Sequence, residues 1–430
     1  MKPGDITHVH FIGVGGIGMS ALARLCLHEG KTVSGSDIKE TAITQALEKE
    51  GVKVSYKQQA GNIKKSHQLV IYTEAVDQKT NEEYLAAKEN KIECINYFDA
   101  LGLFLNDYYL IAVAGSHGKT TTTAMLTDIL EAADFDPTAI VGSIRRETNS
   151  NFRPGKSKYA IVEACEYRRD FLSLKPDVLV ITNIEYEHVD YYKNLADVQK
   201  AFRELAEQVH HDGVIIANTD DAQIATALEG IQDIATIDYT QFFDPLFEEL
   251  PAPGVHNRLN AAAAIAVADY LKIDRYLARA ALKDFKGTWR RFEEKGTLNG
   301  ALVIDDYAHH PTEIKLTVAT VRDLYPYKNL KVVFQPHTHS RLEALFDDFA
   351  KELAKGDEVY VLPVYRAREG KGKKESVDLV TTIAETNPKV EHFDTREQLE
   401  AKLKDGVTKD DVLLVMGAGD VTELASNLTK

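Results

Sequence analysis

The chain has 430 residues, of which 44% are hydrophobic and 27% charged, a composition typical of a soluble globular protein. Its formal net charge of -15 excludes a broad surface for nucleic acid or for an anionic membrane, since either would need a basic excess. A nucleotide is not excluded, because it needs only a local cationic pocket.

The cysteines and the absence of long apolar runs indicate where the protein works. Cys26, Cys94 and Cys165 are far apart and form no CxxC pair, which predicts a reducing compartment and neither a disulfide framework nor a zinc site. The start of the chain has no signal segment, and no apolar stretch approaches the roughly 20 residues of a membrane helix. We expect a cytoplasmic protein without nucleic-acid or membrane partners.

The first hundred residues alternate between strand-like and helix-like stretches. HVHFIGV (8–14), KTVSGSD (31–37) and QLVIYTEAV (68–76) are predicted strands, and helical stretches separate them. Alternation at this spacing predicts a parallel sheet covered by helices.

The same alternation begins again at YYLIAVAG (108–115) and once more at ALVIDDYAHHP (301–311). The sequence therefore predicts an α/β protein with an N-terminal Rossmann-like parallel sheet, a central P-loop ATPase-like domain and a C-terminal Rossmann-like domain. We place these three domains at residues 1–105, 106–295 and 296–430.

A glycine-rich turn follows the first predicted strand. In FIGVGGIGMSAL (11–22), Gly13, Gly15 and Gly18 satisfy G-x-G-x-x-G, and Asp37 ends the next strand. Glycines at such a turn let backbone amides approach a diphosphate at a helix N-terminus. A tight turn with close helix packing would show the same pattern, and the diphosphate could belong to NAD or to a UDP-sugar.

A second turn lies in IAVAGSHGKTTTTAM (111–125). The Walker A pattern requires a glycine five positions before Gly118, where this chain has Val113. Lys119 would reach the β- and γ-phosphates of a nucleotide, and Thr120 would offer its hydroxyl to Mg²⁺. A simple helix cap is the alternative, but it does not explain Gly-Lys-Thr directly after a buried strand. Phosphate binding is therefore favoured.

Two polar residues follow further strands of the same block. Glu163 lies in YAIVEAC (159–165), and His188 follows DVLVITNI (177–184). Nucleotide-bound Mg²⁺ needs oxygen or imidazole ligands besides the P-loop. Taken singly, Glu163 could be a solvated strand end and His188 a partner in a surface ion pair. Their position in the block that holds Lys119 favours the metal site.

Four further polar clusters contain histidine, arginine or acidic residues: GVHNRLNA (254–261), GTWRRFE (287–293), DDYAHHPTE (305–313) and QPHTHSR (335–341). The last two each follow a predicted strand, where open α/β sheets bind ligands. Neither has a zinc spacing with supporting cysteines. An anionic substrate suits them at least as well as a metal, and a solvated loop is the alternative for each.

Read in order, these motifs resemble the Mur ligase superfamily, and the resemblance covers essentially the whole chain. HFIGVGGIGMSALA, GSHGKTTTTAM, DDYAHHPTE and PHTHSR carry it most specifically. The superfamily has a P-loop with this single leading glycine, which accounts for Val113. The resemblance implies an ATP- and Mg²⁺-dependent ligase of peptidoglycan precursor synthesis. It would join the lactyl carboxylate of UDP-N-acetylmuramate to L-alanine through an acyl phosphate, as a monomer or a homodimer.

The resemblance also implies roles for individual residues. The ATP phosphates would be bound by Gly115, Ser116, His117, Gly118, Lys119, Thr120 and Thr121. Residues near the nucleotide would be His256, Asn257 and Arg291. Mg²⁺ would be held by Thr120, Glu163 and His188. The UDP group would face Gly13, Gly15, Gly16, Gly18, Ser36 and Asp37. The reacting centre would be faced by Asp306, His309, His310, His337 and Arg341, with His310 or His337 as the base for the amine.

The chain also departs from the superfamily pattern. EACEYRRDFL (163–172) stands where many members have EADESD-x-SFL, and this changes the charges around Glu163. A dehydrogenase, a nucleotide sensor without catalysis, and a sister ligase that adds glycine or serine or recycles a peptide remain alternatives at this stage.

Overall fold

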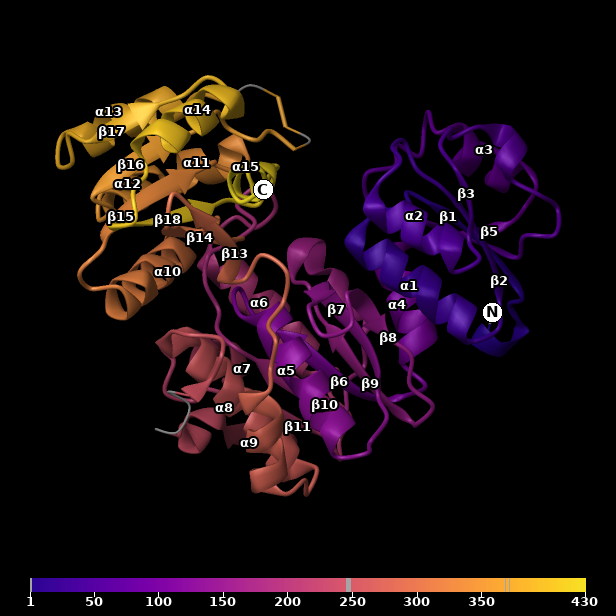
Figure 1. The fold of residues 1–430 in the computed structure, drawn as a ribbon. Coiled ribbons are helices and arrows are strands. Elements are labelled where there is room, and N and C mark those ends of the chain that lie inside the picture. Colours follow the sequence, from indigo (N-terminus) through magenta and orange to yellow (C-terminus); the bar gives the residue numbers. More distant parts are fainter. Residues whose placement is uncertain (1, 245–248, 368, 371) are drawn as a thin grey trace. The chain divides into compact units, whose positions relative to one another are not determined.

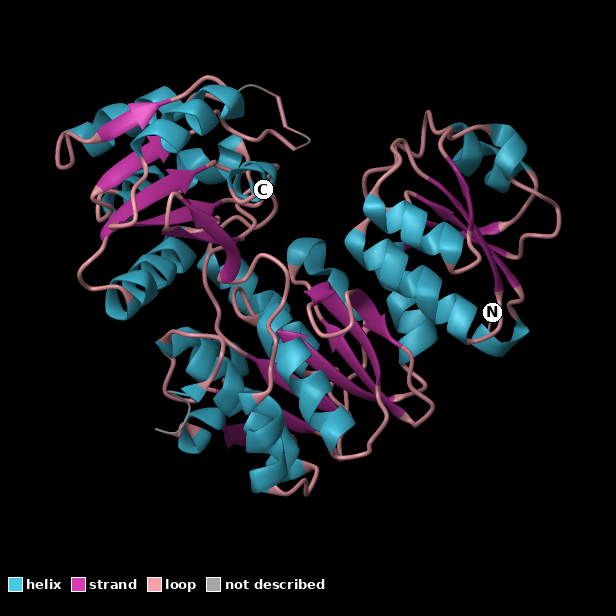
Figure 2. Cartoon of the chain, in the orientation of Figure 1, coloured by secondary structure: helices cyan, strands magenta, loops and turns pink. Residues whose placement is uncertain are grey.

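The computed structural model describes residues 2–244, 249–367, 369–370 and 372–430 (Figures 1 and 2). By compactness the chain divides into two units, which are described separately. The first comprises Met1–Glu185, Ala196–Phe243 and Asn260–Asp284. The second comprises Tyr186–Leu195, Asp244–Leu259 and Phe285–Lys430.

The first unit begins with a five-stranded parallel sheet of order β3-β2-β1-β4-β5. Its strands are β1 (His8–Ile12), β2 (Thr32–Ser36), β3 (Lys53–Ser55), β4 (Leu69–Tyr72) and β5 (Glu93–Asn96). Its helices are α1 (Ile17–His28), α2 (Ala42–Lys49), α3 (Glu82–Glu89) and α4 (Tyr97–Leu105), with short 3₁₀ turns at Pro3–Asp5 and Ala60–Asn62. The central strand β1 places Val9 and Phe11, both fully buried, in the core.

A seven-stranded sheet of order β12-β11-β10-β6-β9-β7-β8 follows. Its strands are β6 (Tyr109–Ala114), β7 (Thr138–Arg145), β8 (Ser150–Arg153), β9 (Tyr159–Glu163), β10 (Val178–Ile181), β11 (Val214–Ala217) and β12 (Ala235–Asp238). Apart from the antiparallel β7–β8 pair, neighbouring strands are parallel. The adjoining elements are α5 (Lys119–Ala132), η3 (Tyr167–Ser173), α6 (Leu195–Ala206), α7 (Ala222–Leu228), η4 (Tyr239–Phe242), α8 (Val255–Tyr270) and α9 (Arg275–Lys283).

The second unit holds a six-stranded sheet of order β13-β14-β18-β15-β16-β17. Its strands are β13 (Glu293–Leu298), β14 (Ala301–Asp306), β15 (Asn329–Phe334), β16 (Glu358–Val361), β17 (Val390–His392) and β18 (Asp411–Met416), and only β13 runs antiparallel to its neighbour. Its helices are α10 (Pro311–Leu324), α11 (His339–Ala344), α12 (Phe346–Leu353), α13 (Ser376–Ala384), α14 (Arg396–Gly406) and α15 (Thr422–Leu428).

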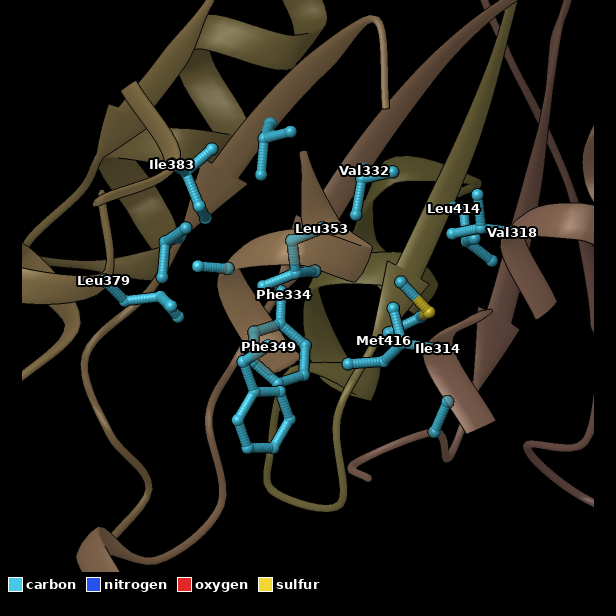
Figure 3. Close-up of a cluster of buried hydrophobic side chains, with 14 of the residues drawn as sticks. Ile314, Val318, Val332, Phe334, Phe349, Leu353, Leu379, Ile383, Leu414 and Met416 are labelled. Atoms are coloured by element: carbon cyan, nitrogen blue, oxygen red, sulfur yellow. The ribbon is translucent and has the colours of Figure 1, made fainter. Parts of the chain in front are cut away.

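Apolar strands explain why this third sheet is buried on both faces. Every residue of β18 is buried, as expected for a central strand of a parallel sheet. On one face Phe334 and Leu414 belong to one buried cluster with Phe349 and Leu353 of the helical layer (Figure 3), and the centroids of the Phe334 and Phe349 rings lie 5.5 Å apart. Each such side chain contributes roughly 1.5–3 kcal/mol when it is fully buried.

The predicted fold class is confirmed: mixed α/β, with three largely parallel sheets among the described residues. The domain limits at 105 and 295 stay a prediction. Cys26, Cys94 and Cys165 are all free thiols. Within the described ranges, no helix has both the length and the apolar character needed to cross a membrane.

Candidate active site

The turn between β6 and α5 has the geometry of a phosphate cradle. Gly115 (φ 138°) and Gly118 (φ 85°) both lie in the left-handed region that favours glycine. A Cβ atom on Gly115 would collide with Oγ1 of Thr182, and one on Gly118 with Oδ1 of Asn260. Val113, in contrast, is fully buried within β6. The turn therefore begins after Ala114, which is why the Walker A spacing does not apply.

Two residues at the end of the neighbouring strand β10 hold this turn. Thr182 Oγ1 donates to the carbonyl oxygen of His117 at 2.5 Å and to that of Ala114 at 3.3 Å. Asn183 accepts from the His117 N–H at 2.9 Å and donates to its carbonyl oxygen at 3.0 Å. Neither residue was predicted, although Thr-Asn directly after a strand that neighbours the P-loop strand is a usable signal.

Of the residues predicted to bind phosphate, Ser116 already has partners in the segment after β10. Ser116 is held by the protein itself: its N–H donates to Asn183 O at 3.1 Å, and its hydroxyl accepts from the Glu185 N–H at 2.8 Å. The first-turn N–H groups of Lys119, Thr120 and Thr121 have no acceptor inside the helix. These amides lie at the positive end of the dipole of α5, a position that suits an anion, and their role in phosphate binding stays a prediction.

Lys119 lies over the turn. Its Nζ donates to Gly115 O at 2.5 Å and to Ser116 O at 3.1 Å, and it lies 2.9 Å from Oε2 of Glu166. Burial lowers the pKa of Lys119, but the charges of Glu166 and Glu163 outweigh it and raise this pKa above its ordinary value. The lysine is therefore a permanent cation. Glu166 was not predicted as a site residue.

Glu163 ends β9, the neighbour of β6 on the other side, and pairs in register with Val113. Its Oε2 accepts from the Gly142 N–H at 2.8 Å, and a Cβ atom on Gly142 would collide with the carboxylate. The Thr120 hydroxyl and the Glu163 carboxylate are hard oxygen donors of the kind that Mg²⁺ prefers, so the chemistry of this pair fits the metal. Because His188 belongs to the other unit, its pairing with Glu163 stays a prediction.

The segment after Glu166 is strained. Arg168 (φ 53°) and Arg169 (φ 63°) are consecutive residues in the left-handed region, which costs roughly 1–2 kcal/mol for each side-chain-bearing residue. Arg169 forms ion pairs with Asp197 at 2.7 Å and with Glu204. These contacts hold the segment in a conformation that its sequence would not adopt alone.

The first glycine turn is built around Asp37. The N–H groups of Gly13 and Val14 donate to the Ser36 carbonyl oxygen, and the Gly15 N–H donates to Asp37 Oδ2 at 2.8 Å. Gly16 is the N-cap of α1. The carboxylate of Asp37 thus organises the turn that the sequence assigned to the UDP group.

Two side chains pack behind this turn. A Cβ atom on Gly18 would lie 2.5 Å from the hydroxyl of Tyr97, so only glycine fits there. Ser36 is fully buried and donates to Oε2 of Glu83 at 2.5 Å. The Ser36 side chain therefore supports the end of β2 and presents no surface to a ligand.

In the second unit, Arg341 is anchored by a residue that was not predicted. Its Nε and Nη2 donate to Oε1 of Glu187 at 3.0 and 2.9 Å, and its Nη1 lies 3.1 Å from Nδ1 of His337. Although burial raises the pKa of Glu187, the Arg341 guanidinium holds it well below its ordinary value.

The histidines of this unit have defined proton positions. Because arginine can only donate, Nδ1 of His337 is an acceptor, and the neutral ring carries its proton on Nε2. Burial lowers the pKa of His337 to about 4 and that of His309 to about 3, with Arg341 adding to both shifts. His309 Nδ1 lies 2.9 Å from the Tyr307 carbonyl oxygen. His310 is the N-cap of α10 and accepts from the Thr312 N–H.

The remaining predicted residues of the second unit have local partners. Asp306 accepts from the N–H groups of Phe292 and Ala308, and burial raises its pKa to about 6. Arg291 lies 3.6 Å from Glu313. Asn257 donates to the Pro253 carbonyl oxygen at 2.7 Å. The neighbouring His256 ring packs so close to Gly254 that a Cβ atom there would lie 2.7 Å from its Cε1 atom.

The strand order and the two glycine turns define an α/β protein whose seven-stranded sheet carries a turn of the P-loop type. Three family profiles match it: the Mur ligase family catalytic domain over residues 8–109, the Mur ligase middle domain over 113–268, and the glutamate ligase domain of Mur ligases over 290–419. The chain belongs to the Mur ligase family.

Two relatives that are similar over nearly their whole length carry the same name. UDP-N-acetylmuramate–L-alanine ligase of Agathobacter rectalis is 40% identical, with 98% of each chain covered. The enzyme of the same name from Caldanaerobacter subterraneus is 39% identical, over 97% of this chain and 96% of the relative. A crystal structure of UDP-N-acetylmuramate–alanine ligase from Thermotoga maritima superposes with a TM-score of 0.80 at 27% identity, covering 98% of each chain.

Proposed function

We propose that this chain joins L-alanine to the lactyl carboxylate of UDP-N-acetylmuramate, with cleavage of ATP to ADP and phosphate, in peptidoglycan precursor synthesis. The observation that carries the proposal is the lysine-bearing phosphate turn of Gly115 to Thr121. It lies in a chain that is 40% identical, over 98% of its length, to a ligase with that activity in its name.

The reaction has two steps in this proposal. The lactyl carboxylate attacks the γ-phosphorus of ATP, which forms an acyl phosphate and releases ADP. The amine of L-alanine then attacks the acyl carbon, and inorganic phosphate leaves. Phosphoryl transfer of this kind depends on positioning and on charge stabilisation more than on covalent help from the protein.

The residues of the P-loop supply both the positioning and the charge stabilisation. The first-turn amides of α5 and the Lys119 ammonium bind the phosphate oxygens, and Lys119 stabilises charge on the transferred group. Thr120, Glu163 and His188 would hold Mg²⁺, which neutralises phosphate charge when bound. The turn of Gly13 to Gly18 would hold the UDP diphosphate, with Asp37 keeping the turn in shape.

The amine must lose a proton before it attacks, and His337 and His310 remain the proposed acceptors. His337 can accept at Nδ1 only if Arg341 moves away from that atom, since the arginine donates to it here. The low pKa of His337 means that its neutral form is available at pH 7.

A phosphate-release assay tests this function. Phosphate should appear with ATP, Mg²⁺, UDP-N-acetylmuramate and L-alanine together, and omission of any one should abolish it. Glycine and L-serine in place of L-alanine test a sister ligase, and a nicotinamide absorbance assay tests a dehydrogenase. Phosphate release that does not depend on UDP-N-acetylmuramate would refute the proposal.

A further inference from the structure

The P-loop lysine already has an anionic partner inside the protein. Both carboxylate oxygens of Glu166 face Lys119 Nζ, at 2.9 Å for Oε2 and 3.2 Å for Oε1. The ammonium also donates to the carbonyl oxygens of Gly115 and Ser116. This cation therefore has an internal partner at the place where the proposed function requires it to bind phosphate.

The ion pair between Glu166 and Lys119 is largely buried, so breaking it is costly. The side chain of Glu166 is 1% exposed and that of Lys119 is 12% exposed. A buried charge is stable only when it is paired, because water cannot replace a lost partner. If phosphate oxygens recruit Lys119, Glu166 loses its contact with this ammonium and faces an anion in its place.

The residues that follow Glu166 restrict its movement away from the P-loop. Arg168 and Arg169, just after it, are both in the left-handed region. Arg168 is tied to Glu74 at 3.0 Å, and Arg169 to Asp197 at 2.7 Å. Both anchors lie just after Glu166, and they hold the segment that carries it beside the P-loop.

We propose that Glu166 is an internal counter-ion that competes with nucleotide phosphates for Lys119, weakening the hold on product ADP and drawing the lysine back onto the empty turn. Glu166 is thus a positioning residue that acts through Lys119. The inference rests on the proposed function because it requires a nucleotide at the P-loop.

Calorimetric titration with ADP and Mg²⁺ tests the competition. The Glu166→Gln variant keeps the shape of the side chain and removes its charge, so the Kd for ADP should fall about tenfold, in the lower range for a hydrogen bond to a charged group. Glu166→Asp, which draws the carboxylate back from Lys119, should give a smaller tightening. Glu207→Gln removes an exposed carboxylate of the same unit and should leave the Kd unchanged.

A Lys119→Met background shows whether the effect passes through the lysine. There, adding Glu166→Gln should change the Kd for ADP less than twofold. An equal tightening in both backgrounds would mean direct repulsion of ADP by Glu166 and would overturn the inference.

Stability without nucleotide is the second readout. Glu166→Gln should lower the unfolding midpoint of the nucleotide-free chain, because Lys119 loses its partner, and saturating ADP should reduce that difference. Unchanged or weaker ADP binding by folded Glu166→Gln, or by Glu166→Asp if the first variant does not fold, overturns the inference alone. A wild-type chain that does not bind ADP overturns the proposed function with it.

Discussion

Glu187 and Arg341 form a buried ion pair in which two nitrogens of the guanidinium share one carboxylate oxygen, at 3.0 and 2.9 Å. The two side chains are 4% and 9% exposed. The pair joins the segment after β10 to the start of α11 within one unit, and it sets the direction of the Arg341 Nη1 atom that reaches His337.

Removal of one partner should cost more than removal of both. Glu187→Gln leaves the Arg341 cation buried without its counter-charge, and we expect the free energy of unfolding to fall by about 3 kcal/mol. Urea denaturation measures the loss. The Glu187→Gln, Arg341→Met double variant should recover part of it, because no unpaired charge remains. If the double variant loses as much as the sum of the two single variants, the two side chains are energetically independent.

The sequence could not reveal Glu187 or Glu166 as readily as their neighbours. Glu187 stands beside His188, and Glu166 lies three residues after Glu163, but the partner of each glutamate is far along the chain. Neither a glutamate in a loop nor a glutamate after a strand has a spacing that points to such a partner. By contrast, Lys119 stands in a motif whose glycines are dictated by local backbone geometry.

The fold was easier to predict from the sequence than the site, because strand periodicity is a local property of the sequence. The apolar runs that became β1, β4 and β6 are predicted directly, since central parallel strands are buried on both faces. No strand is predicted over 138–153, where the structure has the β7–β8 hairpin. That stretch contains Arg145, which is buried in ion pairs with Asp128 and Glu131 of α5. Because the sequence does not show that this charge is buried, the strand is easily mistaken for a polar loop.

Acid should destabilise the protein through His337. Its pKa is about 4 in the folded chain and about 6.5 when unfolded, so between these values the unfolded chain binds more protons. The stabilisation is complete above pH 6.5 and is lost as the pH falls toward 4. In urea unfolding, the stability difference between wild type and His337→Gln should shrink by up to about 3 kcal/mol from pH 7 to pH 4.

His211, whose side chain is 86% exposed, provides the control for this experiment. His211→Gln should follow the wild-type pH dependence throughout. A difference between wild type and His337→Gln that is the same at pH 7 and pH 4 would show that His337 titrates alike in both states.

A substitution at Lys119 should impair the reaction of ATP without impairing the binding of UDP-N-acetylmuramate. Lys119→Met removes the cation over the P-loop but touches nothing in the turn of Gly13 to Gly18. ADP formation should fall by at least a hundredfold, as expected for a phosphate-binding charge, while the Kd for UDP-N-acetylmuramate stays within about twofold in calorimetry. Equal loss of both would contradict the assignment of the two glycine turns to different ligands.

Gly118 offers the most direct test of the cradle itself. In Gly118→Ala the new methyl group must occupy the space of Asn260 Oδ1 at a backbone φ of 85°. Even if the Asn260 side chain rotates away, alanine stays strained at this φ. We expect the turn to relax by moving the first-turn amides of α5, so ADP binding should weaken more than tenfold, while thermal unfolding shows a modest loss of about 1–2 kcal/mol. Gly61→Ala is the matched control, because nothing lies within 4 Å of a Cβ atom there. Since Gly61 lies far along the chain from the P-loop, its alanine variant should bind ADP like the wild type. Normal ADP binding by Gly118→Ala would mean that the amides after Gly118 do not hold the phosphates, and the site would have to be sought elsewhere on the central sheet.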